Sequence, residues 1–317
     1  METRKIQLIA GTTYSISLPK EWVKKHNLKE KNELILYEAN DRSLIVTPHQ
    51  IASKKSNEIS LNIDDYLNNI EQILFSVYYL GIENINLFSK KGISKDTEIK
   101  IRKTLTHMSG TEITYEDKNN IKIKVFLDKS KIDILQVIYR IILIIESSIT
   151  SLLGEFNIEE IRMNENEIDR LYHLISKIIS LSLTDSGILQ SSNINYSSLI
   201  PSYFLIGKKL ENIADNINHI SEYLNSSKGQ FEHSKEILLF IKEEIDRCAN
   251  AIMGKKKNVF EKSSSEKIKH INSLISGIKD KIILNYTEDI IRYTIDVEEE
   301  IVIISFYSHL ISQNIIN

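Results

Sequence analysis

Apolar residues recur at alternating spacings of four and three along the segment 200–225. The positions are Ile206, Leu210, Ile213, Ile217, Ile220 and Leu224. This spacing keeps the side chains on one face of an α-helix and is typical of the seam of a helical bundle or coiled coil. Only 3 prolines and 10 glycines occur among the 317 residues, so few breakers interrupt long helices. The sequence therefore predicts long, packed helices in its C-terminal part.

The helical pattern extends from residue 130 to the end of the chain. Predicted helices cover 131–153, 156–183, 200–225, 230–253 and 263–313, and the polar segment 184–198 is expected to be a flexible break. We therefore expect an all-α bundle over residues 130–317. Its most apolar helix is interrupted by Arg140 and Glu146, and the longest purely apolar run is far shorter than the ~20 residues that span a bilayer. No membrane insertion is expected.

The N-terminal 50 residues, here called the head, have a different pattern. Four strands are predicted at 5–9, 14–18, 33–38 and 43–47, with one helix at 20–26 that starts after Pro19. A segment this small cannot bury enough apolar surface to fold alone without a metal, a disulfide or a partner. The single cysteine, Cys248, excludes a disulfide within one chain and favours a reducing, cytoplasmic setting. We therefore expect the head to form a homodimer.

Residues 58–129, here called the middle domain, alternate between strand and helix patterns. After a linker at 48–57, strands are predicted at 59–63, 82–88, 111–115 and 121–127, with helices at 64–80 and 94–108. The order β-α-β-α-β-β predicts a small α/β sandwich. The whole chain is thus expected to be an α+β multidomain protein.

The distribution of charge separates the head from the remainder. The formal net charge is −3, but residues 1–58 carry ten Lys or Arg against seven Asp or Glu, so the remaining residues carry six excess negative charges. The basic residues of the head include a candidate DNA-contacting set: Arg4, Lys5, Lys20, Lys24, Lys25 and Arg42. A basic patch on an acidic protein can contact DNA phosphates, although a solvated lysine-rich face has the same composition.

Two carboxylate pairs stand four residues apart on predicted helices: Glu165 with Asp169, and Glu211 with Asp215. Residues at this spacing share a helix face, where like charges repel. Each pair is either a solvated face or part of a metal site. Helical phase places both pairs away from the apolar stripes, on an outer face shared between neighbouring helices. Clustered oxygen ligands there would suit Mg, Mn, Ca or Fe.

No arrangement of catalytic residues is present in the sequence. A glycine-rich phosphate loop, a nucleophile elbow and an H-E-x-x-H pair are all missing, and the eight histidines are scattered. The sequence therefore predicts a protein that is not an enzyme.

The head resembles the AbrB/SpoVT swapped-hairpin family, which includes MazE-like domains. The resemblance is carried by Ser-Ile-Ser-Leu-Pro-Lys at 15–20 and by the predicted hairpin Glu-Leu-Ile-Leu at 33–36 with Ser-Leu-Ile-Val at 43–46. It implies an intertwined homodimer that contacts DNA. The positions here that fit the contacting residues of the family are Arg4, Lys5, Lys20 and Arg42.

Residues 130–310 resemble PhoU, the phosphate-uptake regulator, through Asn-Glu-Asn-Glu-Ile-Asp-Arg-Leu-Tyr at 164–172 and Leu-Glu-Asn-Ile-Ala-Asp-Asn-Ile at 210–217. PhoU domains are helical bundles whose Glu/Asp-x-x-x-Asp motifs hold surface metal clusters. The resemblance implies divalent or iron-type ions (Mg, Mn, Fe or Zn) at Glu165, Asp169, Glu211 and Asp215, and no organic cofactor. A third motif departs from the pattern, because Arg292 stands where a carboxylate is expected after Glu288.

The complete chain resembles an archaeal type in which an AbrB-like head precedes one PhoU region. This resemblance implies a dimeric DNA-binding regulator of phosphate uptake and phosphate homeostasis, with DNA, a second copy of the chain and a phosphate transporter ATPase component as partners. The alternative is an interaction protein that does not bind DNA. Such a protein would dock on the ATPase of a phosphate ABC transporter and use the head only to dimerise.

Overall fold

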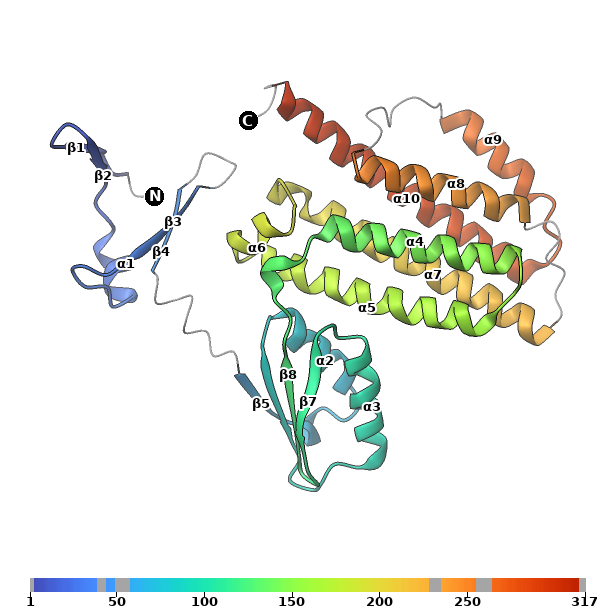
Figure 1. Cartoon of the computed structure of the whole chain (residues 1–317), viewed down its shortest axis with the longest axis horizontal. Helices are drawn as coiled ribbons and strands as arrows, with labels where there is room; N and C mark the ends of the chain where they lie inside the picture. Colours follow the sequence, from blue (N-terminus) through green and yellow to red (C-terminus); the bar gives the residue numbers. More distant parts are fainter. Residues whose placement is uncertain (1–2, 39–43, 49–57, 228–234, 255–263, 314–317) are drawn as a thin grey trace. The chain divides into compact units, whose positions relative to one another are not determined.

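The computed structural model describes residues 3–38, 44–48, 58–227, 235–254 and 264–313 (Figure 1). It divides into two compact units, Met1–Ser56 and Asn57–Asn317. The first unit holds the head, and the second holds the middle domain together with the helical bundle.

The head contains two antiparallel hairpins and one short helix. Its elements are β1 (Gln7–Ile9), β2 (Thr13–Ser15), α1 (Lys20–Lys25), β3 (Leu34–Glu38) and β4 (Leu44–Pro48), with β1 paired to β2 and β3 to β4. The β1–β2 turn contains Ala10 and Gly11, both at positive φ, a conformation that glycine adopts without strain. The four predicted strands and the helix after Pro19 are therefore present.

The strands of the head expose most of their apolar side chains. Seven large apolar residues are more than half exposed: Ile6, Leu8, Ile9, Tyr14, Ile16, Leu36 and Leu44. Pro48 is the one residue classed as buried in the part of the head that the structure describes. A single copy of the head therefore has no hydrophobic core among its described residues.

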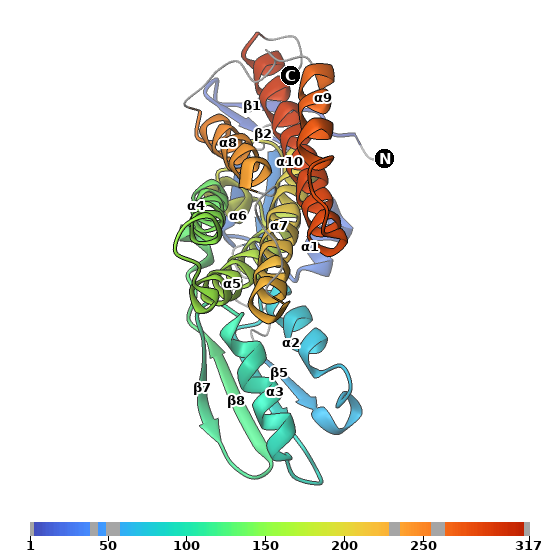
Figure 2. The ribbon, with the colours of Figure 1, turned by 90° about the vertical axis from the view of Figure 1, so that its right-hand side faces the viewer.

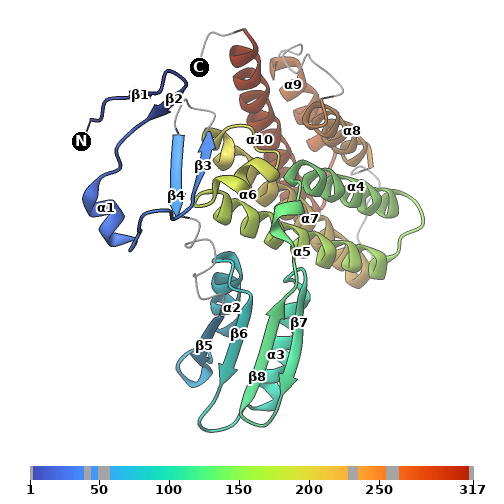
Figure 3. The same cartoon turned by 60° about the vertical axis from the view of Figure 1, so that its left-hand side comes forward.

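The middle domain is a four-stranded sheet covered by two helices on one face (Figures 2 and 3). The strand order is β5-β6-β8-β7, and β5 pairs parallel with β6 while the other pairs are antiparallel. The elements are β5 (Glu58–Asn62), β6 (Asn84–Phe88), β7 (Thr111–Glu116), β8 (Asn120–Val125), α2 (Ile70–Tyr79) and α3 (Lys95–Thr106). The predicted order β-α-β-α-β-β is confirmed. The first helix starts later than predicted, because Asn62 caps a separate 3-10 turn at Ile63–Asp65.

The bundle is built from long helices that share one core. They are α4 (Ile134–Leu153), α5 (Ile158–Ser182), α7 (Ile200–Ser227), α8 (Lys235–Ile252), α9 (Ser264–Ile275) and α10 (Lys281–Ser312). α7 lies in the centre, against α4, α5 and α10. Of the predicted seam, the five residues from Ile206 to Ile220 are fully buried, and Leu224 packs on the edge of the core.

Two predictions about the bundle are wrong. The segment 184–198, expected to be a flexible break, contains the short helix α6 (Ser186–Ser191), and Ile188 and Ile194 are buried in the core. The segment 263–313, expected to be one helix, contains α9 and α10. Asp280 separates them, because its carboxylate accepts hydrogen bonds from the first amides of α10 at 2.9 and 3.3 Å.

Among the described helices, α4 alone is long and apolar enough to cross a membrane by length and composition. Half of its most apolar stretch is buried, and it lies alongside α5, α7 and α8 in the bundle (Figure 1). That placement is typical of a core helix in a soluble protein.

Candidate metal centre

The four carboxylates predicted from the sequence lie on the facing sides of α5 and α7. The two helices run in opposite directions (Figure 1), so Glu165 lies near Asp215, and Asp169 lies near both Asp215 and Glu211. One carboxylate oxygen each from Glu165, Asp169 and Asp215 lies within 4.8 Å of the other two. Glu211 lies at the edge of this group. We call these four residues the α5–α7 cluster.

The close approach of α5 and α7 depends on a glycine of α7. A Cβ atom on Gly207 would lie 3.3 Å from two side-chain atoms of Ile175 on α5, closer than ordinary van der Waals contact. The seam residues of α7 point into the core next to this contact. The carboxylates lie off the apolar seam, and the oxygens from both helices come together at the junction of α5 and α7.

Burial raises the pKa of every carboxyl group in the α5–α7 cluster. The effect is largest at Asp169, whose pKa is raised to about 7 by burial and then by the charges of Glu165, Asp215 and Glu211. Burial is also the main cause of the raised pKa at Glu165, Glu211 and Asp215. Four carboxylates at this separation cannot all remain ionised near neutral pH without a compensating cation.

Among the described residues, one lysine lies within ion-pair distance of this cluster. Lys208 donates to Glu211 over 2.5 Å, and no other Lys or Arg among the described residues pairs with the four carboxylates. The neighbouring Lys209 pairs instead with Asp296 of α10, at 2.7 Å. The positive charge supplied by the described part of the chain is therefore too small to neutralise the cluster.

The middle domain covers part of the face that helical phase predicted to be an open outer surface. α2 packs on α5, and the turn after α3 is held there because Arg170 of α5 donates to Ser109 Oγ over 3.2 Å. Tyr78 Oη donates to the Ser109 carbonyl over 3.1 Å. Lys177 of α5 is 2 % exposed and donates to the Tyr78 carbonyl over 3.1 Å. On the neighbouring α7, the Glu211 side chain is only 12 % exposed.

Each carboxylate pair continues to a histidine four residues later, and neither histidine was among the predicted site residues. His173 follows Asp169, and His219 follows Asp215, so both helices carry Glu-x-x-x-Asp-x-x-x-His along one row. Burial lowers the pKa of His173 to about 4, and Tyr79 Oη lies 2.5 Å from its Nδ1. His219 is exposed and stacks on Tyr286. The repeated four-residue spacing could have identified both histidines from the sequence.

The donor atoms of the α5–α7 cluster fit a divalent cation. Carboxylate oxygens are the ligands of Mg, Mn and Ca, and an added imidazole shifts the preference toward Mn, Fe and Zn. One imidazole nitrogen next to the cluster is without a hydrogen-bond partner in the described structure: Nδ1 of His107, which is buried. A cation would satisfy both the unpaired nitrogen and the excess of negative charge.

The third expected motif, on α10, does not form such a site. Arg292 pairs with Asp289 at 2.8 Å, and Asp296 pairs with Lys209. Nearby, Glu244 and Glu298 share Lys267 and Arg247. These four carboxylates, Asp289, Asp296, Glu244 and Glu298, therefore have cations from the chain itself.

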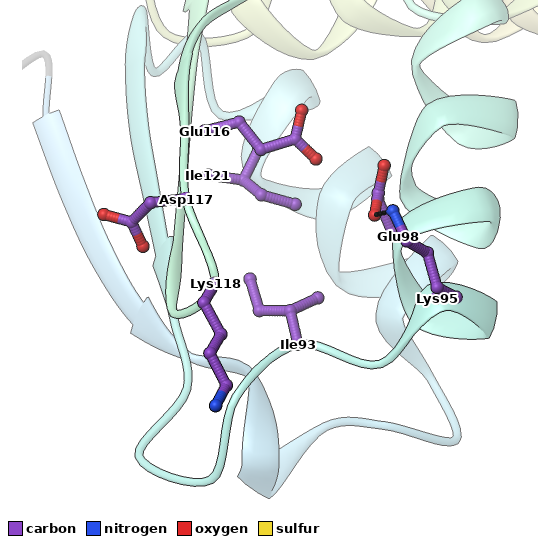
Figure 4. Close-up of a pocket in the computed structure, with 7 residues that line it drawn as sticks. All are labelled: Ile93, Lys95, Glu98, Glu116, Asp117, Lys118 and Ile121. Carbon is purple, nitrogen blue, oxygen red and sulfur yellow. Dashed lines mark hydrogen bonds and ion pairs between the residues drawn. The ribbon is translucent and has the colours of Figure 1, made fainter.

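A polar pocket of about 450 Å³ lies in the middle domain, away from these helices (Figure 4). Ile93, Lys95, Glu98, Glu116, Asp117, Lys118 and Ile121 line it. Glu98 of α3 pairs with Lys95 at 2.9 Å, and Arg102 pairs with both Glu98 and Glu116. Because its acidic groups are already paired, this pocket is a weaker candidate for ligand binding than the α5–α7 cluster.

Three of the four residues predicted to contact DNA lie on the surface of the head. Arg4 and Lys5 precede β1 and Lys20 begins α1, and all three are exposed. Arg42 lies outside the described residues. The head thus carries exposed cations around its first strand and its helix, next to exposed apolar side chains.

Two known families match the chain. Residues 7–54 match the family described as antidote-toxin recognition MazE, bacterial antitoxin, and residues 134–224 match the PhoU domain. No curated protein and no solved structure matches it. The PhoU match includes α4, α5 and almost all of α7, and with them all four residues of the α5–α7 cluster.

Both families are regulatory and not catalytic. MazE-like domains bind DNA and self-associate, and PhoU domains interact with components of phosphate transport. The two matches agree with the two resemblances seen in the sequence. The chain therefore joins an N-terminal domain of the MazE/AbrB type to a C-terminal PhoU domain.

Proposed function

We propose that the chain is a dimeric, DNA-binding regulator of phosphate uptake whose PhoU domain controls the affinity of the head for DNA. The observation that carries this proposal is the presence of a MazE-type domain and a PhoU domain in one chain. A chain with both can link the state of phosphate transport to transcription. The same reasoning makes the cytoplasm its proposed location.

The head is the proposed site of dimerisation and of DNA binding. The described residues of its exposed apolar strands form no core within one copy, and a second copy with the same surface would cover them. Arg4, Lys5 and Lys20 are exposed, and in a dimer each would be present twice. Lys and Arg side chains contact DNA phosphates, which gives binding that weakens steeply as salt rises.

The α5–α7 cluster is the proposed metal site and the sensing part of the protein. Glu165, Asp169, Glu211 and Asp215 would hold Mn, Fe, Zn or Mg, and Asp169 would contribute an oxygen from the middle of the group. A bound cation supplies the positive charge that lets these carboxylates stay ionised side by side. A ligand of this kind can change DNA affinity only if it prefers one arrangement of the protein.

DNA binding by the full-length protein tests the proposal. Fluorescence anisotropy with DNA from the region upstream of its own gene should show binding whose dissociation constant rises with salt, and added Mn²⁺ should change that constant. Lys5→Ala combined with Lys20→Ala should weaken binding and flatten the salt dependence, because a dimer loses up to four phosphate contacts. The matched control, Lys29→Ala with Lys31→Ala, should bind as the unmodified protein does.

Failure of this experiment would favour the other candidate function. A protein that shows no salt-sensitive DNA binding, with the double variant unchanged, would use its head only to dimerise. Its PhoU domain would then act by docking on a phosphate transporter ATPase component.

A further inference from the structure

His107 connects the middle domain to the α5–α7 cluster. It is the C-terminal cap of α3, and its backbone amide donates to the Thr104 carbonyl over 3.1 Å. The turn continues to Gly110, whose φ of +74 favours glycine. A side chain at this position would place its Cβ atom 3.1 Å from Leu127, so glycine is also required by the close packing. Together with the contacts of Ser109 to Arg170 and Tyr78, these constraints hold the turn that carries His107 beside α5.

The ring of His107 points toward Asp169. Its Nδ1 lies 3.9 Å from Asp169 Oδ2, and the side chain is only 15 % exposed. This nitrogen is buried and makes no hydrogen bond among the described residues. A separation of 3.9 Å is too long for a hydrogen bond, so the pair as it stands satisfies neither group.

The same separation fits two ligands of one metal ion. Nitrogen and oxygen ligands lie about 2.1 Å from a transition-metal ion, so two donors on one ion are at most about 4.2 Å apart. The distance between His107 Nδ1 and Asp169 Oδ2 is within this limit. The three carboxylate oxygens of the cluster, within 4.8 Å of one another, need only small side-chain rotations to reach the same ion.

We propose that His107 of the middle domain is a ligand of the metal ion held by the α5–α7 cluster. The inference rests on the proposed metal site, and it adds a nitrogen ligand from outside the PhoU match, which begins at residue 134. The metal then joins the middle domain to the PhoU helices. A nitrogen ligand also selects Mn, Fe, Co or Zn over Mg and Ca.

Co²⁺ titration of the full-length protein tests the proposal directly. His107→Cys should produce the intense thiolate-to-Co²⁺ charge-transfer absorption in the near ultraviolet, because a thiolate would replace the imidazole on the metal. The unmodified protein, whose single Cys248 is buried in the bundle core away from the cluster, should lack this absorption. His107→Ala should weaken Co²⁺ binding by at least about tenfold in isothermal titration calorimetry.

Two control variants separate this inference from the proposed function. His270→Ala removes an exposed histidine of α9 and should leave Co²⁺ affinity unchanged. Asp169→Asn should abolish tight binding. If unmodified protein binds Co²⁺ and Asp169→Asn does not, but His107→Ala retains full affinity and His107→Cys shows no charge transfer, the metal site stands and the role of His107 is overturned.

Loss of Co²⁺ binding by the unmodified protein would overturn both the metal site and the inference. Thermal unfolding of the metal-free variants checks that they fold, and His107→Gln provides a second variant of similar size. Amide hydrogen exchange offers a further readout: Co²⁺ should slow exchange in segment 107–110 of the unmodified protein and not of His107→Gln. Equal exchange in the presence and absence of Co²⁺ would count against ligation by His107.

Discussion

Carboxylates line two regions of the bundle, and the chain supplies cations to them unequally. On α8, α9 and α10, Glu244 and Glu298 share Lys267 and Arg247, and Lys267 Nζ lies 2.5 Å from Glu244 Oε2. We call these four residues the α8–α10 cluster. On α5 and α7, four carboxylates have Lys208 as their one lysine partner in the described structure. Both regions are substantially buried, so the difference lies in charge and not in exposure.

This difference shows what each region needs in order to be stable. Negative charge in the α8–α10 cluster is neutralised within the chain, so removing a cation there should destabilise the fold. In the α5–α7 cluster, the negative charge that Lys208 does not balance remains to be neutralised by bound protons or by an added cation. Removing a carboxylate there should therefore stabilise the metal-free protein. The two clusters should therefore respond to charge removal with opposite signs.

The largest expected effect is the loss of Lys267. Lys267→Met leaves Glu244, whose side chain is 10 % exposed, and Glu298 with Arg247 as their one remaining cation partner in the described structure, and breaking buried ion pairs is strongly destabilising. We expect the free energy of unfolding in urea at pH 7 to fall by about 3 kcal/mol. Lys269→Met, at an exposed position of the same helix, is the control. A loss below about 1 kcal/mol would mean that Arg247 alone neutralises the α8–α10 cluster.

The second effect is stabilisation by metal. Mn²⁺ at a hundred times its dissociation constant should raise the free energy of unfolding by about 2.7 kcal/mol if it binds only the folded protein. The gain should disappear in Asp169→Asn and persist in Glu298→Gln, measured by urea unfolding with and without Mn²⁺. Loss of the gain in Glu298→Gln would place the metal in the α8–α10 cluster.

The third effect is stabilisation by Asp169→Asn in metal-free protein. The pKa of Asp169 is raised from 3.8 to about 7 in the folded state, so the folded protein holds a proton that the unfolded chain releases between these values. The contribution of protonated Asp169 to the free energy of unfolding is thus fully present below about pH 4 and is lost as the pH rises to 7. Three pKa units correspond to about 4 kcal/mol, and sharing of protons within the cluster should reduce the effect to about 2 kcal/mol at pH 8.

Unfolding curves from pH 4 to 8 measure this effect. The unmodified protein should lose stability over this range relative to Asp169→Asn, and the two should converge near pH 4. If Asp169→Asn were less stable at pH 8 without metal, then the carboxylate would already have a compensating cation, and the contrast between the two clusters would be wrong.

The smallest effect is expected at Arg292. Its guanidinium pairs with Asp289, and both side chains are well exposed, at 62 and 40 %. Exposed ion pairs contribute little, because water and salt screen them. Arg292→Ala should therefore give no measurable change in urea unfolding. A clear loss of stability would show that this pair, at the edge of the carboxylate-rich surface, matters as much as the buried ones.

Much of the fold was predictable because its signals are local. The strands of the head and the middle domain follow from alternation and turn residues, and the α7 seam follows from its spacing. The break between α9 and α10 was also encoded locally, by Gly277 and by the cap Asp280, but the helical period on both sides outweighed it. α6 was missed because a polar segment conceals two buried isoleucines, Ile188 and Ile194.

Only those residues of the candidate site that lie four apart on a single helix were predictable from the sequence. Spacing identifies Glu165 with Asp169 and Glu211 with Asp215, and the same spacing extends to His173 and His219. The position of His107 has no such signal. It lies 62 residues before Asp169 in the chain, and only the docking of the middle domain on α5 brings the two together. Burial of the cluster was missed for the same reason.

The exposed apolar strands of the head have a consequence for how the protein responds to its own abundance. If the head completes its core only with a second copy, its folding is bimolecular, and its stability rises with protein concentration. Under the proposed function, DNA binding would then depend on expression level as well as on the state of the PhoU domain. At low copy number the regulator would be inactive whatever its PhoU domain senses, so the cell would set the threshold of the response by the rate of synthesis.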